Sequence, residues 1–233
     1  MAIGNVTPDS FYAASRLTSD KVLDWARQAL EDGADILDIG ACSTRPDSTP
    51  VDEEEEWRRL EPALRAIKEA FPDTRLSVDT FRVDIARRVL EQFGPTIIND
   101  ISGGCDEMYA LVQRYDVPYV FTFRGIYKKL EILDFTQSFK WVLDPGLGFC
   151  GGVEADYECL RRIDELKVFN RPVLVGVSRK SMIYKPLGLT PDTCLSATQA
   201  LQMYALAHGA TILRTHDVAA TRQTIKLFEL CNS

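Results

Sequence analysis

Asp38-Ile39-Gly40-Ala41-Cys42-Ser43-Thr44-Arg45-Pro46 is the stretch that decides the fold, because its character changes at Gly40. The segment of residues 34–39 that leads into it is short and mostly apolar, as a buried strand would be. Residues 41–46, in contrast, form a small, polar, cationic segment that ends in a proline. The acidic run at residues 52–56 follows where the N-terminus of a helix favours negative charge. We therefore predict a strand, a functional loop and a helix, in that order.

The same order of apolar segment, polar tip and helix recurs along the chain. The fifth repeat is the weakest, since residues 122–140 contain a loop and at best a poor helix, and the sixth predicts a helix over residues 153–167. Eight repeats in 233 residues fit a (β/α)8 TIM barrel of the α/β class, which typically takes about 250 residues, as one domain spanning residues 1–233. The predicted strands lie at residues 1–4, 34–39, 76–80, 96–100, 117–121, 141–146, 172–177 and 210–213.

Composition narrows the class of protein. The chain is 45% hydrophobic and 26% charged, as in ordinary globular proteins, and its formal charge of −7 argues against a general nucleic-acid surface. Its six cysteines form no C-x-x-C pair, so neither a structural zinc site nor a redox motif is indicated. The sequence contains no secretory signal pattern and no apolar run near the roughly 18 residues of a membrane helix, so we expect a cytoplasmic protein with free thiols.

Three polar tips point to a planar, nitrogen-rich ligand. A TIM barrel gathers the tips of its strands at one mouth, where Asp79, Asn99 and Asp144 would converge. Carboxylates accept hydrogen bonds from ring N–H and amino groups, whereas the carboxamide both donates and accepts, so together they can satisfy a guanidine-like edge. These residues predict a site for a heterocycle.

Other tips point to phosphate. Lys180, Arg214 and His216 supply cationic donors for phosphate or carboxylate oxygens, and Arg214 can bind in a bidentate way. Asn5 offers a neutral oxygen to a magnesium ion that keeps most of its waters and is held mainly by substrate phosphates. The two sets of tips together imply a heterocycle that carries a polyphosphate.

Each tip also has a simpler interpretation, since an Asp after a strand is more often a turn former or a helix cap. We interpret Arg179 as one partner of a surface salt bridge and His208 as a structural residue. The acidic run 52–56 is interpreted as a solvated helix face and not a metal site. Cys42 and Cys150 are expected near the cavity as packing residues.

Seven blocks, in order along nearly the whole chain, resemble dihydropteroate synthase, the folate-pathway family of the pterin-binding barrels. The blocks are Asn5-Val6-Thr7-Pro8-Asp9-Ser10-Phe11, Asp38-Ile39-Gly40 with Ser43-Thr44-Arg45-Pro46, Ser77-Val78-Asp79-Thr80, Ile98-Asn99-Asp100 with Ser102-Gly103-Gly104, Leu143-Asp144-Pro145-Gly146, Gly176-Val177-Ser178-Arg179-Lys180-Ser181, and Arg214 with His216-Asp217-Val218. The resemblance implies a transferase that condenses 6-hydroxymethyl-7,8-dihydropterin diphosphate with 4-aminobenzoate to 7,8-dihydropteroate and diphosphate. It also implies a homodimer and competition by sulfonamides.

The resemblance further assigns roles to residues. Asp79, Asp144 and Lys180 would be catalytic, with the carboxylates stabilising a pterin cation left by dissociative loss of diphosphate. Asn5 would hold Mg2+. The implied binding sets are Asp79, Asn99, Asp144 and Lys180 for the pterin; Thr44, Arg214, Thr215 and His216 for the diphosphate; and Thr44, Arg45, Pro46, Phe149, Lys180 and Ser181 for 4-aminobenzoate.

The chain departs from the family pattern at several positions, and two alternatives to a dihydropteroate synthase stay open. Residues 148–152 read Gly-Phe-Cys-Gly-Gly where the family usually has Gly-Phe-Gly-Lys, Ala41-Cys42 stands where Gly-Glu is common, and the segment 121–141 is short. One alternative is a pterin- or folate-dependent methyltransferase on the same barrel, which needs neither the Ser-Thr-Arg-Pro motif nor Arg214 and His216. The other is a non-catalytic pterin-binding paralogue.

Overall fold

The computed structural model describes residues 1–6, 19–42, 51–123 and 140–232. They fall into two compact units, Met1–Tyr119 (unit 1) and Val120–Ser233 (unit 2). The strands β1 to β6 join one sheet in chain order, and β7 and β8 form a second sheet. None of the helices in these ranges is long and apolar enough to cross a membrane. That residues 1–233 fold as one domain stays a prediction.

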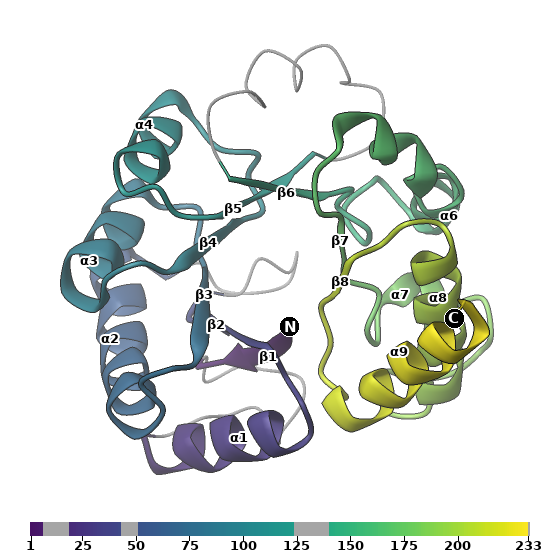
Figure 1. Cartoon of the computed structure of the whole chain (residues 1–233), viewed down its shortest axis with the longest axis horizontal. Coiled ribbons are helices and arrows are strands. Elements are labelled where there is room, and N and C mark those ends of the chain that lie inside the picture. Colours follow the sequence, from purple (N-terminus) through teal and green to yellow (C-terminus); the bar gives the residue numbers. More distant parts are fainter. Residues whose placement is uncertain (7–18, 43–50, 124–139, 233) are drawn as a thin grey trace. The chain divides into compact units, whose positions relative to one another are not determined.

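In unit 1, parallel strands alternate with helices that cover one face of the sheet, as Figure 1 shows. The parallel pairing requires such crossovers, because a tight hairpin can only join antiparallel strands. The elements are β1 (Ala2–Asn5), α1 (Ser19–Glu31), β2 (Ile36–Gly40), α2 (Glu53–Ala70), β3 (Arg75–Asp79), α3 (Val83–Phe93), β4 (Ile97–Asp100) and α4 (Asp106–Arg114).

Local sequence signals set the helix ends in unit 1. Gly33 ends α1 with φ 96°, and its N–H donates to Leu30 O at 3.0 Å, a conformation that favours glycine. Asp52 caps α2 by accepting the Glu55 N–H at 2.8 Å, and four glutamates fill the first turn. The helix start expected at the acidic run 52–56 therefore agrees with the structure.

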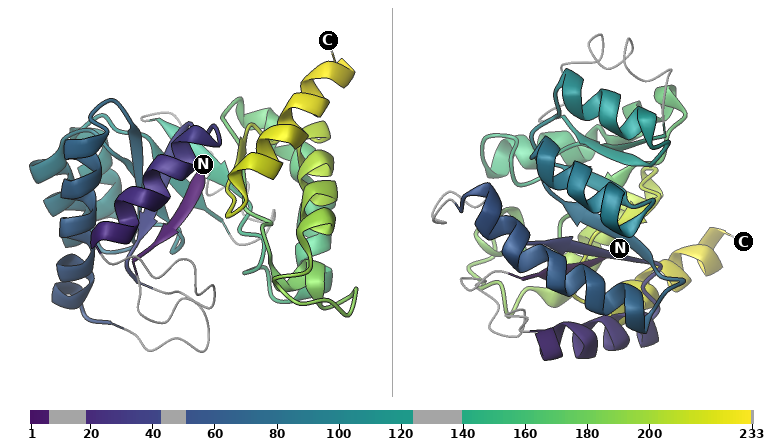
Figure 2. Two further views of the ribbon diagram at one scale, coloured as in Figure 1. Left: turned by 90° about the horizontal axis from the view of Figure 1, so that it is seen from below. Right: turned by 90° about the vertical axis from the view of Figure 1, so that its left-hand side faces the viewer.

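Unit 2 contains β5 (Tyr119–Thr122, which begins one residue before the unit boundary), β6 (Trp141–Asp144), β7 (Leu174–Val175) and β8 (Ile212–Leu213). A parallel bridge between Leu143 and Val173 links β6 to the segment leading into β7. The helices are α6 (Val153–Arg161), η3 (Ile163–Phe169), α7 (Ser181–Tyr184), α8 (Leu195–Ala207) and α9 (Val218–Asn232). Helices α8 and α9 pack against each other, as the left view of Figure 2 shows.

The eight predicted strands are all present in the described ranges, but β6, β7 and β8 are shorter than predicted and one predicted helix is divided. The helix expected over residues 153–167 is divided into α6 and the 3-10 helix η3, in which Ile163 and Leu166 are buried at the three-residue spacing of a 3-10 turn. Strand β7 is shorter than expected, because Pro172 lacks an N–H for the ladder. His208 stacks on Tyr204 at 4.2 Å between ring centroids, which agrees with a structural role.

Candidate active site

The ends of four strands in unit 1 align polar side chains in one row. Asn5 pairs with Gly40, Gly40 with Asp79, and Asp79 with Asn99, so these positions share one face of the sheet. A Cβ atom at Gly40 would lie 3.6 Å from Asn5 Oδ1 and 3.3 Å from Asp79 Cβ. The missing side chain of Gly40 therefore leaves Asn5 and Asp79 on either side of the same small space.

Asp38 supports this row from the layer below. It lies two residues before Gly40, hence on the same face, and is fully buried. The Asn99 amide donates from Nδ2 to Asp38 Oδ2 at 3.0 Å. Because a carboxylate only accepts, this bond identifies the NH2 end of the Asn99 amide and fixes its orientation. The set of site residues predicted from sequence omitted Asp38, although its place in the period-two alternation of β2 could have revealed it.

Glu56 corrects our interpretation of the acidic run as a solvated face. It is fully buried, accepts the Thr80 hydroxyl at 2.7 Å and pairs with Arg82, which also donates to Val51 O at 2.6 Å. The reason is helical spacing, since Glu56 precedes the buried Leu60 by one turn and so lies on the same face of α2. Glu56 thereby ties α2 to Thr80, the residue that follows Asp79.

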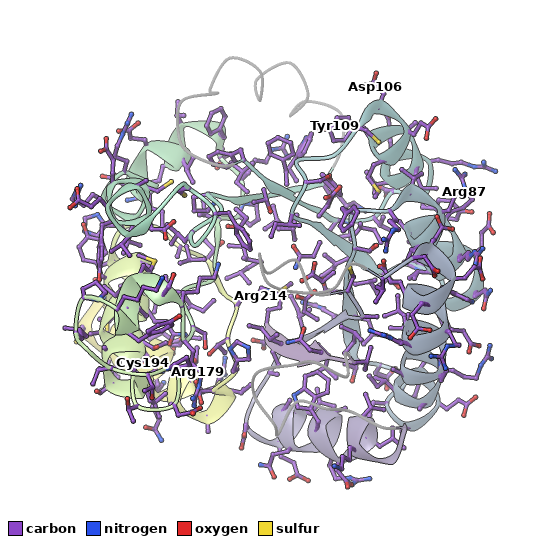
Figure 3. All side chains as sticks on the ribbon, turned by 180° about the vertical axis from the view of Figure 1, so that it is seen from behind. Arg87, Asp106, Tyr109, Arg179, Cys194 and Arg214 are labelled. Carbon is purple, nitrogen blue, oxygen red and sulfur yellow. The ribbon has the colours of Figure 1, made fainter. Side chains whose placement is uncertain are left out.

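A second buried carboxylate orders the segment after Asn99. Asp100 accepts the Tyr119 hydroxyl at 2.8 Å and the Ser102 N–H at 2.7 Å, and burial raises the pKa of Asp100. Tyr109, labelled in Figure 3, donates to Gly103 O at 2.5 Å and lies edge-on to Tyr119. The glycine-rich turn that follows Asn99 is thus held by two tyrosines and a carboxylate.

In unit 2, Asp144, Lys180 and Arg214 come together from the ends of β6, β7 and β8. The Lys180 ammonium donates to Leu147 O and lies 5.0 Å from the Phe149 ring centroid. Desolvation of Lys180 lowers its pKa; the Asp144 carboxylate opposes this by raising it, and the Arg214 guanidinium lowers it further. The cluster therefore joins one carboxylate to two cations beside an aromatic ring.

Gly148 makes room for this cluster, and Gly176 lies at ordinary contact distance from it. A Cβ atom at Gly148, whose φ is +89°, would lie 2.8 Å from Lys180 Cδ, and one at Gly176 would lie 3.7 Å from Arg214 Cβ. The buried Asp156 of α6, which the sequence prediction missed, accepts the Gly148 N–H at 2.7 Å. Asp156 thereby fixes the turn that carries Phe149.

The segments after β7 and β8 are joined by side chains. The predicted salt bridge of Arg179 exists, but its location at the surface is wrong: the Arg179 side chain is 10% exposed and binds Asp217 in a bidentate fork at 2.9 and 2.7 Å. Its Nη1 also donates to Pro191 O at 2.9 Å, and Figure 3 marks Arg179 with Cys194. The contacts of the Arg179 side chain compensate for the strain of its backbone, which has φ 55°.

Next to this pair, Ser178 contacts His216, with Ser178 Oγ 3.1 Å from His216 Nδ1. Thr215 is 2% exposed, and its hydroxyl bonds to Ser178 and Thr221. Ser178 was outside the predicted set of site residues, and no periodicity distinguishes it from an ordinary strand-end serine.

Four residues of the predicted 4-aminobenzoate site remain to be located, Thr44, Arg45, Pro46 and Ser181. Ser181 begins α7, directly after Lys180. Thr44, Arg45 and Pro46 lie outside the described residues. No group of three or more His, Cys, Asp or Glu side chains suited to a metal occurs in the part of the chain that the structure describes.

Comparisons with known proteins agree on the family. The model of the family described as "Pterin binding enzyme" matches residues 1–130 and 123–216. The dihydropteroate synthase of Streptococcus pyogenes is 36% identical over 248 residues, which cover 97% of this chain and 92% of that protein.

Two solved structures extend the comparison. A dihydropteroate synthase from Coxiella burnetii in complex with pteroic acid has a TM-score of 0.88 and 33% identity, covering 100% of this chain and 92% of the other. The Yersinia pestis enzyme in a sulfonamide drug complex has a TM-score of 0.90 and 30% identity, covering 100% and 93%. The predicted α/β TIM-barrel fold class is confirmed, and the chain belongs to the dihydropteroate synthase family of pterin-binding enzymes.

Proposed function

We propose that this chain is a dihydropteroate synthase, a transferase of folate biosynthesis that joins 6-hydroxymethyl-7,8-dihydropterin diphosphate to 4-aminobenzoate and releases diphosphate. The observation that carries the proposal is the cluster of Asp144 with Lys180 and Arg214, whose two cationic side chains both lie against Gly176. A carboxylate suits the electron-poor pterin ring, and neighbouring cations suit an anionic leaving group. The reaction needs both kinds of group within reach of the bond that breaks.

The pterin is assigned to Asp79, Asn99, Asp144 and Lys180. In support, Asp38 fixes the Asn99 amide at 3.0 Å, so its oxygen and its second N–H have defined directions. A flat heterocycle with donors and acceptors along one edge requires such preorganised partners, because a mismatched buried polar pair costs binding energy.

The diphosphate is assigned to Arg214 and His216, with Thr44 and Thr215 completing the predicted set. A guanidinium fork matches two phosphate oxygens, which supports Arg214 as the principal anion ligand. Because the Thr215 hydroxyl is buried and bonded to Ser178 and Thr221, we revise its part to a supporting one.

The 4-aminobenzoate is assigned to Thr44, Arg45, Pro46, Phe149, Lys180 and Ser181, where sulfonamides would compete. Phe149 supports this assignment, since its ring lies 5.0 Å from the Lys180 ammonium and offers an apolar face to an aromatic acid. Arg45 and Lys180 supply cations for the carboxylate.

The mechanism follows from charge. Loss of diphosphate leaves positive charge on the pterin methylene that is conjugated into the ring, and the Asp79 and Asp144 carboxylates stabilise this charge as it develops. The aniline nitrogen of 4-aminobenzoate then attacks the methylene and forms the C–N bond, and its extra proton passes to the released diphosphate or to solvent without an obligatory general base. Lys180 and Arg214 stabilise the departing anion.

Magnesium is proposed as a companion of the diphosphate. Asn5 Oδ1 faces the space beside Gly40, and one neutral oxygen suits an ion that keeps its waters and is held mainly by phosphates. When bound, Mg2+ neutralises charge on the leaving group. We further propose a cytoplasmic homodimer, on the family resemblance alone.

The decisive experiment follows diphosphate release while 4-aminobenzoate is titrated into the chain with dihydropterin diphosphate and Mg2+. We expect saturable release that depends on 4-aminobenzoate and is inhibited by a sulfonamide. Pterin binding without release would identify a non-catalytic paralogue. Methyl transfer from a folate substrate, with no diphosphate released, would identify the methyltransferase alternative.

Asp79→Asn tests the dissociative step. The substitution keeps the shape but removes the negative charge, so we expect diphosphate release in single turnover to slow by about 100-fold, in the range of losing one transition-state electrostatic contact. An unchanged single-turnover rate would argue against a cationic pterin intermediate.

A further inference from the structure

Asp156 is a buried carboxylate in the first turn of α6 that binds the turn before the helix instead of solvent. It is 2% exposed, and its Oδ1 accepts the Gly148 N–H at 2.7 Å and the Cys150 N–H at 3.3 Å. These two amides lie immediately before and after Phe149. The Phe149 N–H itself donates to Gly146 O at 2.9 Å, which fixes its nitrogen but not the peptide that follows. One carboxylate oxygen therefore holds the backbone on both sides of Phe149.

The backbone that follows Phe149 needs such bonds to keep one conformation. Gly151 and Gly152, which lead into α6, have φ +108° and +137°, and a Cβ atom at either would meet no atom of the described residues within 4 Å. Glycine loses more backbone freedom on folding than any other residue, so this segment is costly to order. The Cys150 thiol contacts Gly146 O at 3.3 Å, but a thiol is a weak donor. The charged acceptor on Asp156 is thus the stronger of the two holds on this part of the turn.

The start of the turn is fixed by other groups. The Gly146 N–H donates to Asp144 Oδ1 at 2.8 Å. Leu147, whose carbonyl accepts a hydrogen bond from the Lys180 ammonium, is 1% exposed. We therefore expect the contact of Lys180 with Leu147 to survive the loss of Asp156, whereas the turn beyond Leu147 should lose its fixed geometry.

We propose that Asp156 is a positioning residue for the 4-aminobenzoate site, because it holds the Phe149 ring beside the Lys180 ammonium. The ring centroid lies 5.0 Å from that ammonium, so an aromatic acid can pack its ring on Phe149 and direct its carboxylate to the cation. The inference rests on the proposed function, which assigns Phe149 and Lys180 to 4-aminobenzoate. A displaced Phe149 ring weakens the binding of 4-aminobenzoate and leaves the pterin pocket intact.

Amide hydrogen exchange of the full chain without ligands, followed by NMR, tests the hold on the turn. We expect slow exchange at Gly148 and Cys150 in wild type and about tenfold faster exchange at both in Asp156→Ala, the scale of one hydrogen bond to a charged group. The Ile98 N–H, which donates to Pro118 O at 3.1 Å in unit 1, should exchange as in wild type and so report an intact fold. Asp156→Asn keeps an oxygen acceptor of the same shape and should retain slow exchange.

Steady-state kinetics tests the consequence for the substrate. Asp156→Ala should raise the KM for 4-aminobenzoate about tenfold and leave the KM for the dihydropterin substrate unchanged. Asp156→Asn should restore the KM for 4-aminobenzoate to near the wild-type value. Glu154→Ala is the matched control and should change neither KM, because Glu154 is an exposed carboxylate in the same turn of α6.

Rapid exchange at Gly148 and Cys150 in folded wild type would overturn the proposal. An equal rise of both KM values in Asp156→Ala would also overturn it, because it would indicate a general structural role. If Asp156→Ala does not fold, wild-type exchange and the kinetics of Asp156→Glu decide, since the added methylene moves the carboxylate and should raise only the KM for 4-aminobenzoate.

The two measurements also separate this inference from the proposed function. If Asp156→Ala loosens the turn but wild type releases no diphosphate with 4-aminobenzoate, the proposed function fails and the hold of Asp156 on the turn stands. If wild type is active and Asp156→Ala has the wild-type KM for 4-aminobenzoate, the positioning role fails and the proposed function stands.

Discussion

Lys180 shows how one residue combines conflicting demands. Its ammonium is partly desolvated, which lowers its pKa, while Asp144 favours the charge and Arg214 opposes it. Such an environment is costly for folding and useful for binding anions, because a charge with little water around it interacts more strongly with a substrate. The lowered pKa is therefore expected where the chemistry occurs.

Lys180→Met should raise stability and lower activity. Below both the folded and the unfolded pKa, Lys180 is charged in both states and the desolvation cost is fully present. As pH rises through the lowered folded pKa towards 10.5, the folded protein loses the proton first and the cost disappears. At pH 7 we expect Lys180→Met to have a higher free energy of unfolding than wild type, and this difference should become smaller by pH 10.5. The kcat/KM of the variant should be about 100-fold lower than that of wild type.

Denaturant unfolding at a series of pH values measures the difference in the free energy of unfolding between Lys180→Met and wild type. Lys185→Met is the control, because Lys185 is exposed. A gap between Lys180→Met and wild type that widens with pH would contradict the argument.

Asp38 acts through Asn99. Asp38→Asn replaces an acceptor-only group with one that can present a donor, so the Asn99 amide loses its fixed orientation. We expect the KM for the dihydropterin substrate to rise about tenfold, the scale of one charge-assisted hydrogen bond, with little change in the KM for 4-aminobenzoate. Steady-state kinetics with each substrate varied in turn checks the split, and Asp73→Asn, at an exposed position, is the control. A rise confined to 4-aminobenzoate would count against this role.

At the scale of elements, Arg179 connects the end of β7 to the start of α9. Asp217 immediately precedes α9, and its carbonyl accepts the Thr221 N–H of that helix at 3.0 Å. Arg179→Ala leaves the half-buried Asp217 carboxylate without its fork, so we expect a loss of about 3 kcal/mol in the free energy of unfolding.

Arg87→Ala is the control variant for Arg179→Ala. Arg87 lies 3.6 Å from Asp84 on the surface of α3, with side chains 42% and 64% exposed, and is labelled in Figure 3. An exposed pair contributes at most about 1 kcal/mol. Equal losses in urea unfolding of the two variants would refute the distinction.

The same elements show what the sequence could predict. Period-two alternation and polar strand ends located Asp79, Asn99 and Asp144, because these signals are local. Glu56 was misplaced because we interpreted its charge as solvated, although its one-turn spacing from the buried Leu60 is a local signal. Arg179 was misplaced because its burial depends on Asp217, a partner 38 residues away. Contacts of that kind leave no periodic mark in the sequence. The strand-by-strand order of the fold was therefore predictable, whereas the buried polar network beneath the site was not.

At the scale of the whole molecule, β5 makes the two units dependent on each other through the chain. The Ile98 N–H beside it donates to Pro118 O within unit 1, and the Phe123 N–H donates to Asp144 O within unit 2. Cutting the chain between residues 119 and 120 would divide this strand after its first residue.

We therefore predict that the full chain unfolds in one cooperative transition, as a single domain over residues 1–233 would. Three tryptophans provide the test, since Trp25 and Trp57 lie in unit 1 and Trp141 lies in unit 2. Trp141→Phe leaves only the unit 1 reporters, and the double variant Trp25→Phe with Trp57→Phe leaves only Trp141, which is 2% exposed and lies edge-on to Phe121. In each of these two variants, the unfolding transition followed by fluorescence should have the same midpoint as the transition followed by circular dichroism. Fluorescence of one variant that changes at a lower denaturant concentration than its dichroism would show that the two units unfold separately.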